Sequence, residues 1–435
     1  MARFVEVSVS YPIPHNWKWD SIGNYAKIKS GYPFDSEKFS DDPTGRQPLI
    51  RIRDILREST NTFTDECCPE EYIIHAGDIL IGMDGDFNVG KWNSDDALLN
   101  QRVCYIQSNS NCLLNDYLYY YLPGILKIIN NATPSVTVKH LSANTLRKTQ
   151  IPLPPLAEQQ RIVDRIESLF AKLDEAKEKA QAVVDSFETR KAAILHKAFT
   201  GELTAKWREE HGVRMESWEK KRLSDVVTEF KYGTSEKSDY NNKGIPVLRI
   251  PNIGDNGIDL SDIKYLNHRN VDSESQIHEG DILIIRSNGS RDLVGKAVLV
   301  PELGCEYAYA SFLIRAKPNH SIINAHYLTI FLNSTDARGQ MFRRAKSSAG
   351  INNINTKELG AISLTVPSLQ EQDEIVHIIN EMMDKDQQSK EAAEAVLVQI
   401  DLMKKSILAR AFRGELGTND PSEESAVELL KRTIL

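Results

Sequence analysis

The stretch closest to a known catalytic or cofactor-binding motif runs from Gly85 to Lys91 and reads GDFNVGK. It nearly matches a phosphate-binding P-loop, in which backbone amides and a lysine hold the nucleotide phosphates and a following Ser or Thr binds magnesium. Trp92 stands where that Ser or Thr belongs, and a related stretch from Gly289, GSRDLVGKA, has a different spacing as well. The sequence therefore favours a turn between strands. A nucleotide-binding enzyme that uses Gly85–Lys91 is the alternative.

Other catalytic signatures are missing from the sequence. It has no HExxH or GxSxG motif, no glycine loop of the type that binds S-adenosylmethionine, no Asn/Asp-Pro-Pro-aromatic tetrapeptide and no convincing set of metal ligands. We therefore predict a chain that is not an enzyme and that holds no cofactor and no metal.

Basic and polar residues gather in several predicted loops and strands. The net charge of −8 is unlike that of a typical nucleic-acid-binding protein, but a net count hides local clusters. Arg, Asn and Ser side chains can contact base edges while nearby Lys and Arg bind phosphate. The run LIRIR is predicted to place two arginines on one side of a strand. The candidate DNA-binding residues are Arg51, Arg53, Asn88, Lys91, Arg102, Lys139, Arg249, Arg286, Ser287, Asn288, Arg291, Lys296, Arg343, Arg344 and Lys346. Solvated charged loops are the alternative interpretation.

The length and composition limit the class of protein. At 435 residues the chain suggests two to four domains, and 41% hydrophobic with 26% charged residues is typical of soluble globular proteins. The most apolar stretch, from Leu113, is broken by Asn115, Asp116, Pro123 and Gly124, so no membrane span is expected. The start lacks the features of a signal peptide, and five cysteines without a CxxC pair suggest free thiols. We expect a cytoplasmic protein without a membrane partner.

An internal repeat organises the whole chain. RKAAILHKAFTGEL from Arg190 matches MKKSILARAFRGEL from Met403 at eight of 14 positions, 213 residues later. PLAEQQRIV and SLQEQDEIV repeat at the same offset, and upstream AGDILI, VGK, PLIRIRDI and Trp17 have counterparts in EGDILI, VGK, PVLRIPNI and Trp218. Because the order of these markers is the same in both halves, duplication is the economical explanation.

Two long helices are predicted from heptad spacing of apolar residues. The first series is Ile162, Ile166, Leu169, Leu173, Ala176, Ala180, Val183 and Phe187. The second is Ile375, Ile379, Met382, Asp386, Ser389, Ala393, Val396, Ile400, Met403 and Ile407, with a weaker middle at Asp386 and Ser389. Ser368 and Glu371 form a capping-box pattern, and Gly201 and Gly414 mark the stops. We expect the helices to pair antiparallel as a coiled coil, with a pseudo-two-fold relation between the halves.

The remaining segments are rich in short β-like runs bounded by Gly, Asn, Asp and Pro, with helical pieces between them. We therefore predict an α+β protein with two mixed α/β domains and two long helices. The predicted boundaries are 1–153 for the first domain, 154–200 for the central helix, 201–216 for a linker, 217–366 for the second domain, 367–413 for the C-terminal helix and 414–435 for a tail.

The layout of the chain resembles the specificity subunit of type I restriction-modification enzymes. The similarity rests on PLPPLAEQQRIVDRIESLFAKLD and RKAAILHKAFTGELTAKWR in the middle, and on VPSLQEQDEIVHII and KKSILARAFRGEL near the end. SSAGINNINTKELGAISLTVPSLQEQ, from Ser347, also resembles the family's run from the second target-recognition domain into its conserved helix. The corresponding stretch from Thr133 departs from the Gly-Ile-Asn-Asn form, so loop contacts are not carried from one half to the other.

The resemblance implies a division of labour. Each domain would recognise one half of a split double-stranded DNA target, and the paired helices would separate the domains. The helices would also bind two modification subunits that carry S-adenosylmethionine and methylate adenine, and ATP-using motor-nuclease subunits would join the complex. A coiled-coil scaffold protein that does not recognise DNA sequence is the alternative from another class.

Overall fold

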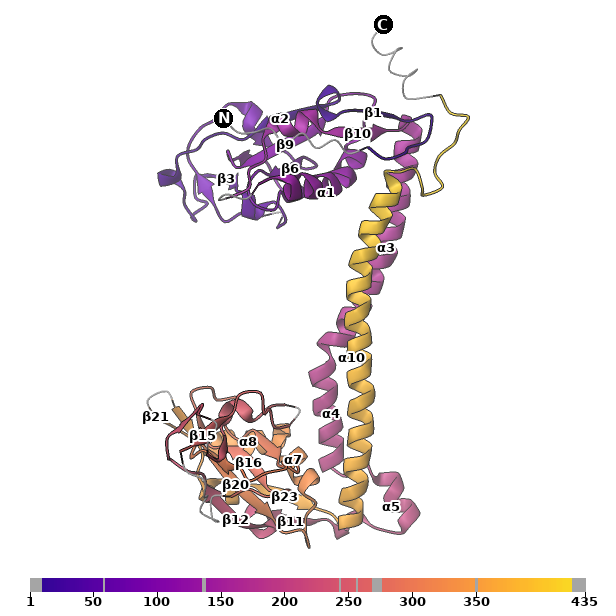
Figure 1. The fold of residues 1–435 in the computed structure, drawn as a ribbon. Coiled ribbons are helices and arrows are strands. Elements are labelled where there is room, and N and C mark those ends of the chain that lie inside the picture. Colours follow the sequence, from indigo (N-terminus) through magenta and orange to yellow (C-terminus); the bar gives the residue numbers. More distant parts are fainter. Residues whose placement is uncertain are drawn as a thin grey trace. The chain divides into compact units, whose positions relative to one another are not determined.

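The computed structural model describes residues 10–57, 59–134, 138–241, 244–255, 257–267, 276–348 and 351–424. The chain divides into two compact units, Met1–Ala180 together with Ala395–Leu435, and Gln181–Glu394. We call them the first and second units. Helices α3 (Leu156–Asp185) and α10 (Leu369–Ala411) each contribute residues to both units (Figure 1).

The described residues of the first unit form two four-stranded sheets and one two-stranded sheet. The strand orders are β2-β9-β6-β7, β4-β3-β8-β5 and β1-β10. The strands are β1 (Lys18–Ser21), β2 (Ala26–Ser30), β3 (Gln47–Ile50), β4 (Phe63–Thr64), β5 (Ile73–Ile74), β6 (Ile79–Gly82), β7 (Val89–Lys91), β8 (Ala97–Leu99), β9 (Val103–Ser108) and β10 (Gln150–Leu153). The helices are η1 (Ile22–Asn24), η2 (Ser36–Lys38), η3 (Ile52–Asp54), η4 (Glu70–Tyr72), α1 (Asn115–Ala132) and α2 (Ala143–Lys148), with α1 packed against β7 and β9.

The second unit repeats this design. Its sheets have the orders β12-β20-β16-β18, β13-β15-β14-β19, β11-β23 and β17-β22-β21. The strands are β11 (Glu219–Arg222), β12 (Val227–Tyr232), β13 (Ser238–Asp239), β14 (Pro246–Leu248), β15 (Lys264–Leu266), β16 (Ile282–Ile285), β17 (Ser287–Asn288), β18 (Ala297–Leu299), β19 (Ala308–Tyr309), β20 (Leu313–Pro318), β21 (Lys346–Ser348), β22 (Ile351–Asn353) and β23 (Ser363–Val366). The helices are α4 (Phe187–Phe199), α5 (Ala205–His211), η5 (Met215–Ser217), α6 (Leu223–Val226), η6 (Ile250–Asn252), α7 (Ala325–Asn333), α8 (Thr335–Arg344) and α9 (Thr356–Gly360).

Strand register shows which residues of the two units are equivalent. In the first unit Ile79 lies opposite Ile106, and in the second Ile282 lies opposite Ala316. Both central strands are completely buried apolar runs, which is why the AGDILI and EGDILI signals are so similar. The mixed α+β architecture predicted from the sequence, built on an internal repeat, is confirmed.

The VGK match between the halves is a coincidence of sequence. Val89–Lys91 forms β7, and Lys91 pairs with Ile79. At the equivalent place in the second unit Ile282 pairs with Leu299, whereas the second VGK, from Val294, lies in the turn before β18. Strands β7 and β18 are therefore equivalent. The offset that aligns them is three residues longer than the offset between the two VGK sequences.

The central helical region is divided in two. The predicted helix over 154–200 appears as α3 and α4, with Ser186 between them. The Ser186 hydroxyl donates to the carbonyl of Ala182 at 2.6 Å, and the Arg190 guanidinium donates to the carbonyl of Val183 at 3.1 Å. Side chains that bond to helix carbonyls in this way compete with the backbone ladder, and this accounts for the break. The predicted linker over 201–216 also contains helix α5.

The long helices pair antiparallel within each unit. In the first unit Lys404 of α10 pairs with Asp174 of α3 at 2.5 Å, and Arg161 of α3 contacts residue Glu423 beyond the end of α10 at 2.8 Å. In the second unit Arg190 of α4 pairs with Asp386 of α10 at 2.6 Å. Antiparallel helix pairing is thus present in both units.

The buried seam of α10 differs from the predicted one at every second position. Met382, Val396 and Met403 are exposed, by 37%, 44% and 49%. The less exposed residues are Ile379, Met383, Asp386, Lys390, Ala393, Leu397, Ile400, Lys404 and Ile407, again spaced by four and three. The lysines at two of these positions lie over the rings of Phe187 and Phe170, at 4.6 and 4.9 Å from the ring centroids. A search for apolar residues missed this seam because lysines occupy two of its positions, where their ammonium groups lie over aromatic rings.

A buried glutamate lies near the start of each long helix. Glu158 accepts from the indole of Trp17 at 2.8 Å, and Glu371 accepts from that of Trp218 at 2.9 Å. The predicted capping box is half formed: the Glu371 amide bonds to the Ser368 hydroxyl at 3.3 Å, but its carboxylate contacts Trp218 and its neighbours instead. The helix stops are confirmed, since Gly201 and Gly414 adopt φ values of +82° and +73° just after the helices end.

The described part of the chain contains no helix that is both long and apolar enough to cross a membrane.

Candidate nucleic-acid interface

A cluster of exposed and partly exposed polar residues forms around the turn between β6 and β7 in the first unit. The Asp84 carboxylate lies 3.2 Å from Arg102 Nη1, with which it forms an ion pair, and 2.7 Å from His140 Nδ1. The neighbouring Gly85 amide donates to the carbonyl of Lys139 at 3.0 Å, and the Lys139 ammonium donates to the carbonyl of Asn130 at 2.7 Å. The turn, Arg102, the end of α1 and the Lys139–His140 segment are therefore joined at one surface.

The turn that carries this cluster has a fixed shape. Gly85 and Phe87 adopt left-handed backbone conformations, with φ of 76° and 53°. The Phe87 side chain is buried, so it anchors the tip of the turn in the core. The predicted alternative of a nucleotide-binding loop is not supported, because residues 85–88 form a hairpin turn, Val89–Lys91 forms β7, and the Lys91 ammonium pairs with Asp116.

The second unit has its own polar surface at the end of β16. The guanidinium of Arg286 lies 4.4 Å from the ring centroid of Tyr232. Its Nε donates to the side chain of Asn353 and its Nη1 to the carbonyl of Ser311, both at 3.4 Å. Phe312 is 56% exposed beside this cluster. Aromatic rings and a stacked guanidinium offer both apolar and hydrogen-bonding contacts to a ligand.

Three further candidates belong to the small sheet next to Arg286. Ser287 and Asn288 form β17, which pairs with Asn353 and Asn352 of β22. Lys346 lies in β21 of the same sheet, and its side chain lies outside the described part of the structure. The sheet therefore brings a row of hydroxyl and amide groups together with Arg286.

The other basic residues of this unit differ in how free their side chains are to contact a ligand. Arg291 is exposed, and its guanidinium lies 5.1 Å from the ring centroid of Phe342. Arg343 is exposed at the end of α8, whereas Arg344 donates to the carbonyl of Gln340 at 3.1 Å and so caps its own helix. Arg344 is thereby occupied by a structural contact.

The prediction that Arg51 and Arg53 share one side of a strand is wrong. Strand β3 ends at Ile50, and the two arginines lie at the start and within η3. The reason is Asp54, whose carboxylate accepts from the Arg51 amide at 2.9 Å and turns the chain into a 3-10 helix. Arg249 lies at the same place before η6, where its guanidinium pairs with Asp262 at 3.0 Å.

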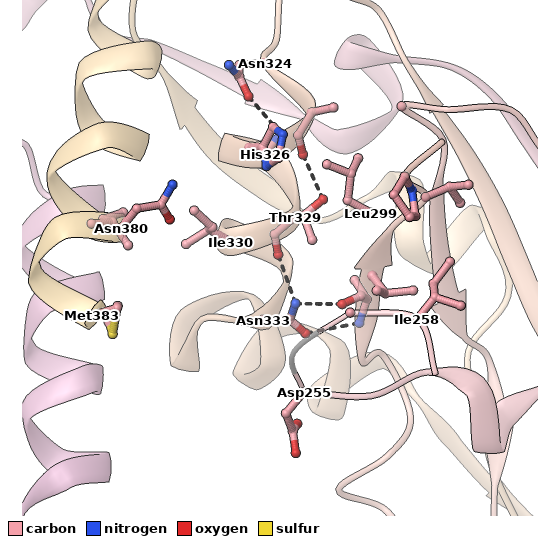
Figure 2. A pocket seen from close by; sticks show the side chains of 18 of the residues that line it. Asp255, Ile258, Leu299, Asn324, His326, Thr329, Ile330, Asn333, Asn380 and Met383 are labelled. Carbon is pink, nitrogen blue, oxygen red and sulfur yellow. Dashed lines mark hydrogen bonds between the residues drawn. The ribbon is translucent and has the colours of Figure 1, made fainter. Parts of the chain in front are cut away.

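Lys296 faces a groove in the second unit and pairs with Asp255 at 2.8 Å, which lowers the pKa of that carboxyl. The groove has a volume of about 1410 Å³. Figure 2 shows Asn380 and Met383 of α10 on one side and residues of α7 on the other. The Asn333 amide bridges α7 to β18 through the backbone of Ala297, at 2.8 and 3.0 Å. The Lys296 ammonium is therefore occupied by an ion pair with Asp255.

Sequence reasoning missed four residues of these surfaces: Asp84, His140, Tyr232 and Phe312. An acidic residue and aromatic side chains do not stand out in a search for basic clusters, and their neighbours are distant in the sequence. The repeat itself was the available signal, since Asp84 and Phe312 lie next to strands whose register matches between the units.

The chain matches the model of the type I restriction modification DNA specificity domain twice, at residues 14–184 and 215–396. It belongs to this family. The two matched segments follow the internal repeat, so the specificity subunit resemblance inferred from the sequence is confirmed.

Individual relatives agree with this assignment. The chain is 32% identical over 420 residues to the type I restriction enzyme EcoBI specificity subunit of Escherichia coli, covering 93% of this chain and 87% of the relative. It has the fold of the HsdS subunit from Thermoanaerobacter tengcongensis, with a TM-score of 0.61, 18% identity and coverage of 93% and 99%. A chain from a structural study of complex assembly and conformational transition in the type I R-M system gives a TM-score of 0.67, 20% identity and coverage of 94% and 100%.

Proposed function

We propose that this protein is the DNA sequence-recognition subunit of a type I restriction-modification complex. Residues 1–153 would recognise one half-site and residues 217–366 the other. The observation that carries the proposal is the repeated specificity domain, in which one topology presents two different sets of exposed side chains. Two identical domains would select a symmetric target, so two diverged ones should select an asymmetric bipartite target.

Two groups of candidate residues support DNA binding. Those in or beside the polar clusters are exposed or partly exposed and lie near hydrogen-bonding or stacking partners: Asn88, Arg102, Lys139, Arg286, Ser287, Asn288, Arg291 and Arg343. Arg51 and Arg53 lie at η3 in the first unit and Arg249 lies before η6 in the second, and we assign these three residues to phosphate contacts. Affinity would come largely from phosphate contacts and discrimination from base contacts.

Partner subunits would supply the chemistry. In this proposal the long helices dock two modification subunits, and motor-nuclease subunits complete the complex. The antiparallel pairing within each unit and the name of the EcoBI relative support this role. A scaffold protein without DNA recognition would not need two diverged specificity domains.

Mapping of methylated adenine in genomic DNA tests the proposal. Cells that carry this chain with its modification and restriction subunits should show methylation at one asymmetric bipartite sequence. Cells that lack only this chain should lose methylation at that sequence and nowhere else. Unchanged methylation after its deletion, or a target that has only one half-site, would contradict the proposal.

A further inference from the structure

Arg102 and Phe312 occupy the same position in the two units. Val103 lies opposite Gly82, and Leu313 lies opposite Ile285, at the equivalent ends of the central strands. The residues just beyond these pairs form the same backbone hydrogen bond in both units. The carbonyl of Arg102 accepts from the Met83 amide, and the carbonyl of Phe312 accepts from the Arg286 amide, both at 3.0 Å.

A third segment completes the equivalence. The Leu141 amide donates to the carbonyl of Met83 at 2.7 Å, and the Ile354 amide donates to that of Arg286 at 2.9 Å. His140, the residue before Leu141, pairs with Asp84. Asn353, the residue before Ile354, pairs with Ser287. The backbone of this site is thus the same in both units.

The side chains on this common backbone differ in chemistry. The Arg102 side chain is 59% exposed and Phe312 is 56% exposed. Arg102 is accompanied by an acid and a histidine, whereas Phe312 is accompanied by a stacked arginine and an asparagine. A conserved backbone with exchanged, exposed side chains is what two domains with different base preferences require.

Asp84 positions the Arg102 guanidinium without occupying it. One guanidinium nitrogen contacts the carboxylate, and among the described residues no other polar partner of Arg102 is within bonding distance. An ion pair between exposed side chains contributes little to stability, so a structural role does not explain this one. The negative charge of Asp84 also weakens attraction to phosphate, while the planar donors of Arg102 remain available to a base edge.

We infer that position 102, and its equivalent 312, are the specificity-determining positions of the two half-sites. Arg102 recognises a guanine through its O6 and N7 acceptors, with Asp84 as a positioning residue. Phe312 makes an apolar contact at the second half-site, as with the methyl group of a thymine. This inference rests on the proposed function, since it assigns chemistry to the same two domains.

Selection from randomised DNA targets by the full chain, assembled with its modification subunits, tests the inference. Arg102→Ala should lose the preference for one guanine in the first half-site by about ten- to hundredfold, with the second half-site unchanged. Arg102→Lys keeps the charge but not the fixed pair of planar donors, so it should weaken the same preference less than Arg102→Ala does. Phe312→Ala should change only the second half-site. Arg46→Ala, which breaks another Arg–Asp pair of the first unit (3.3 Å), is the matched control and should change neither.

Asp84 requires a separate comparison. Asp84→Ala should reduce the guanine preference, and Asp84→Asn should restore part of it because the amide oxygen still accepts a hydrogen bond. Melting temperatures of all variants should stay close to that of the wild type. Uniform weakening on every target, with base preferences intact, would overturn the inference and leave the proposed function standing. Failure of the wild-type complex to select any bipartite target would overturn both.

Discussion

The two buried glutamates occupy equivalent places but have different partners. Glu371 accepts from Thr204 at 2.7 Å and from the buried guanidinium of Arg208 at 2.6 Å, in addition to Trp218. Glu158 accepts from Trp17 and from Asn419, both at 2.8 Å, and its Oε1 has no partner among the described residues. A glutamine at position 371 therefore leaves the buried Arg208 guanidinium without a counter-charge. A glutamine at position 158 leaves no buried cation.

We expect Glu371→Gln to destabilise the second unit by about 3 kcal/mol, because Arg208 loses its counter-charge in a buried setting. Glu158→Gln is the matched control and should cost the first unit about 1 kcal/mol or less. Pulse proteolysis in urea, with peptides of each unit followed separately by mass spectrometry, measures both effects. Equal losses in the two variants would show that the ion pair with Arg208 contributes little.

The same comparison predicts a pH dependence. Burial raises the pKa of Glu158, against the opposing effect of its bonds to Trp17 and Asn419. A carboxyl whose folded pKa is raised stabilises the fold fully below its unfolded pKa, near 4.5, and this contribution is lost as pH rises through the folded value.

The stability of the wild-type first unit relative to Glu158→Gln should therefore fall as pH rises from about 4.5. Urea unfolding across that range checks the sign. A difference that is constant, or that grows with pH, would contradict the burial argument.

At the scale of elements, the shifted seam of α10 can be tested on two adjacent residues. Leu397 lies on the observed seam and is partly buried, whereas Val396 belongs to the predicted seam and is 44% exposed. Leu397→Ala should destabilise the first unit by about 2 kcal/mol through lost packing. Val396→Ala should change its stability by less than about 0.5 kcal/mol. Thermal unfolding of the two variants distinguishes the seams, and a larger loss for Val396→Ala would restore the predicted one.

Much of the element structure could be predicted from the sequence. Completely buried runs such as DILI specify central strands, and heptad spacing with a terminal glycine specifies a long helix and its end. The break at Ser186 and the seam at Lys390 could not be predicted, because both depend on side chains that bond to a carbonyl or cover a ring. Likewise, Arg102 was a candidate from its type alone, but its partner Asp84 became visible only when the strands were paired.

At the scale of the whole molecule, the proposed bipartite target predicts a response to helix length. Inserting one heptad after Ala180 and one after Ala393 adds about 10.5 Å of helix to each while keeping the heptad spacing. At about 3.4 Å per base pair, this corresponds to about three base pairs. Binding of the original target by the assembled variant should collapse, and targets with a longer unread gap should restore it. Full-strength binding of the original target by a folded variant would show that the helices do not set the gap.

The first unit is built from two segments that are distant in the chain, and its core includes Phe412, whose ring lies 5.2 and 5.1 Å from those of Tyr117 and Tyr121. The second unit is one continuous segment. During synthesis on the ribosome, the second unit can therefore complete its core before the first, although the first begins earlier. Until Phe412 has been synthesised, Tyr117 and Tyr121 lack this aromatic partner, and the part of the first core that it covers stays incomplete. The unit that begins first along the chain is thus the second to have all of its core residues available.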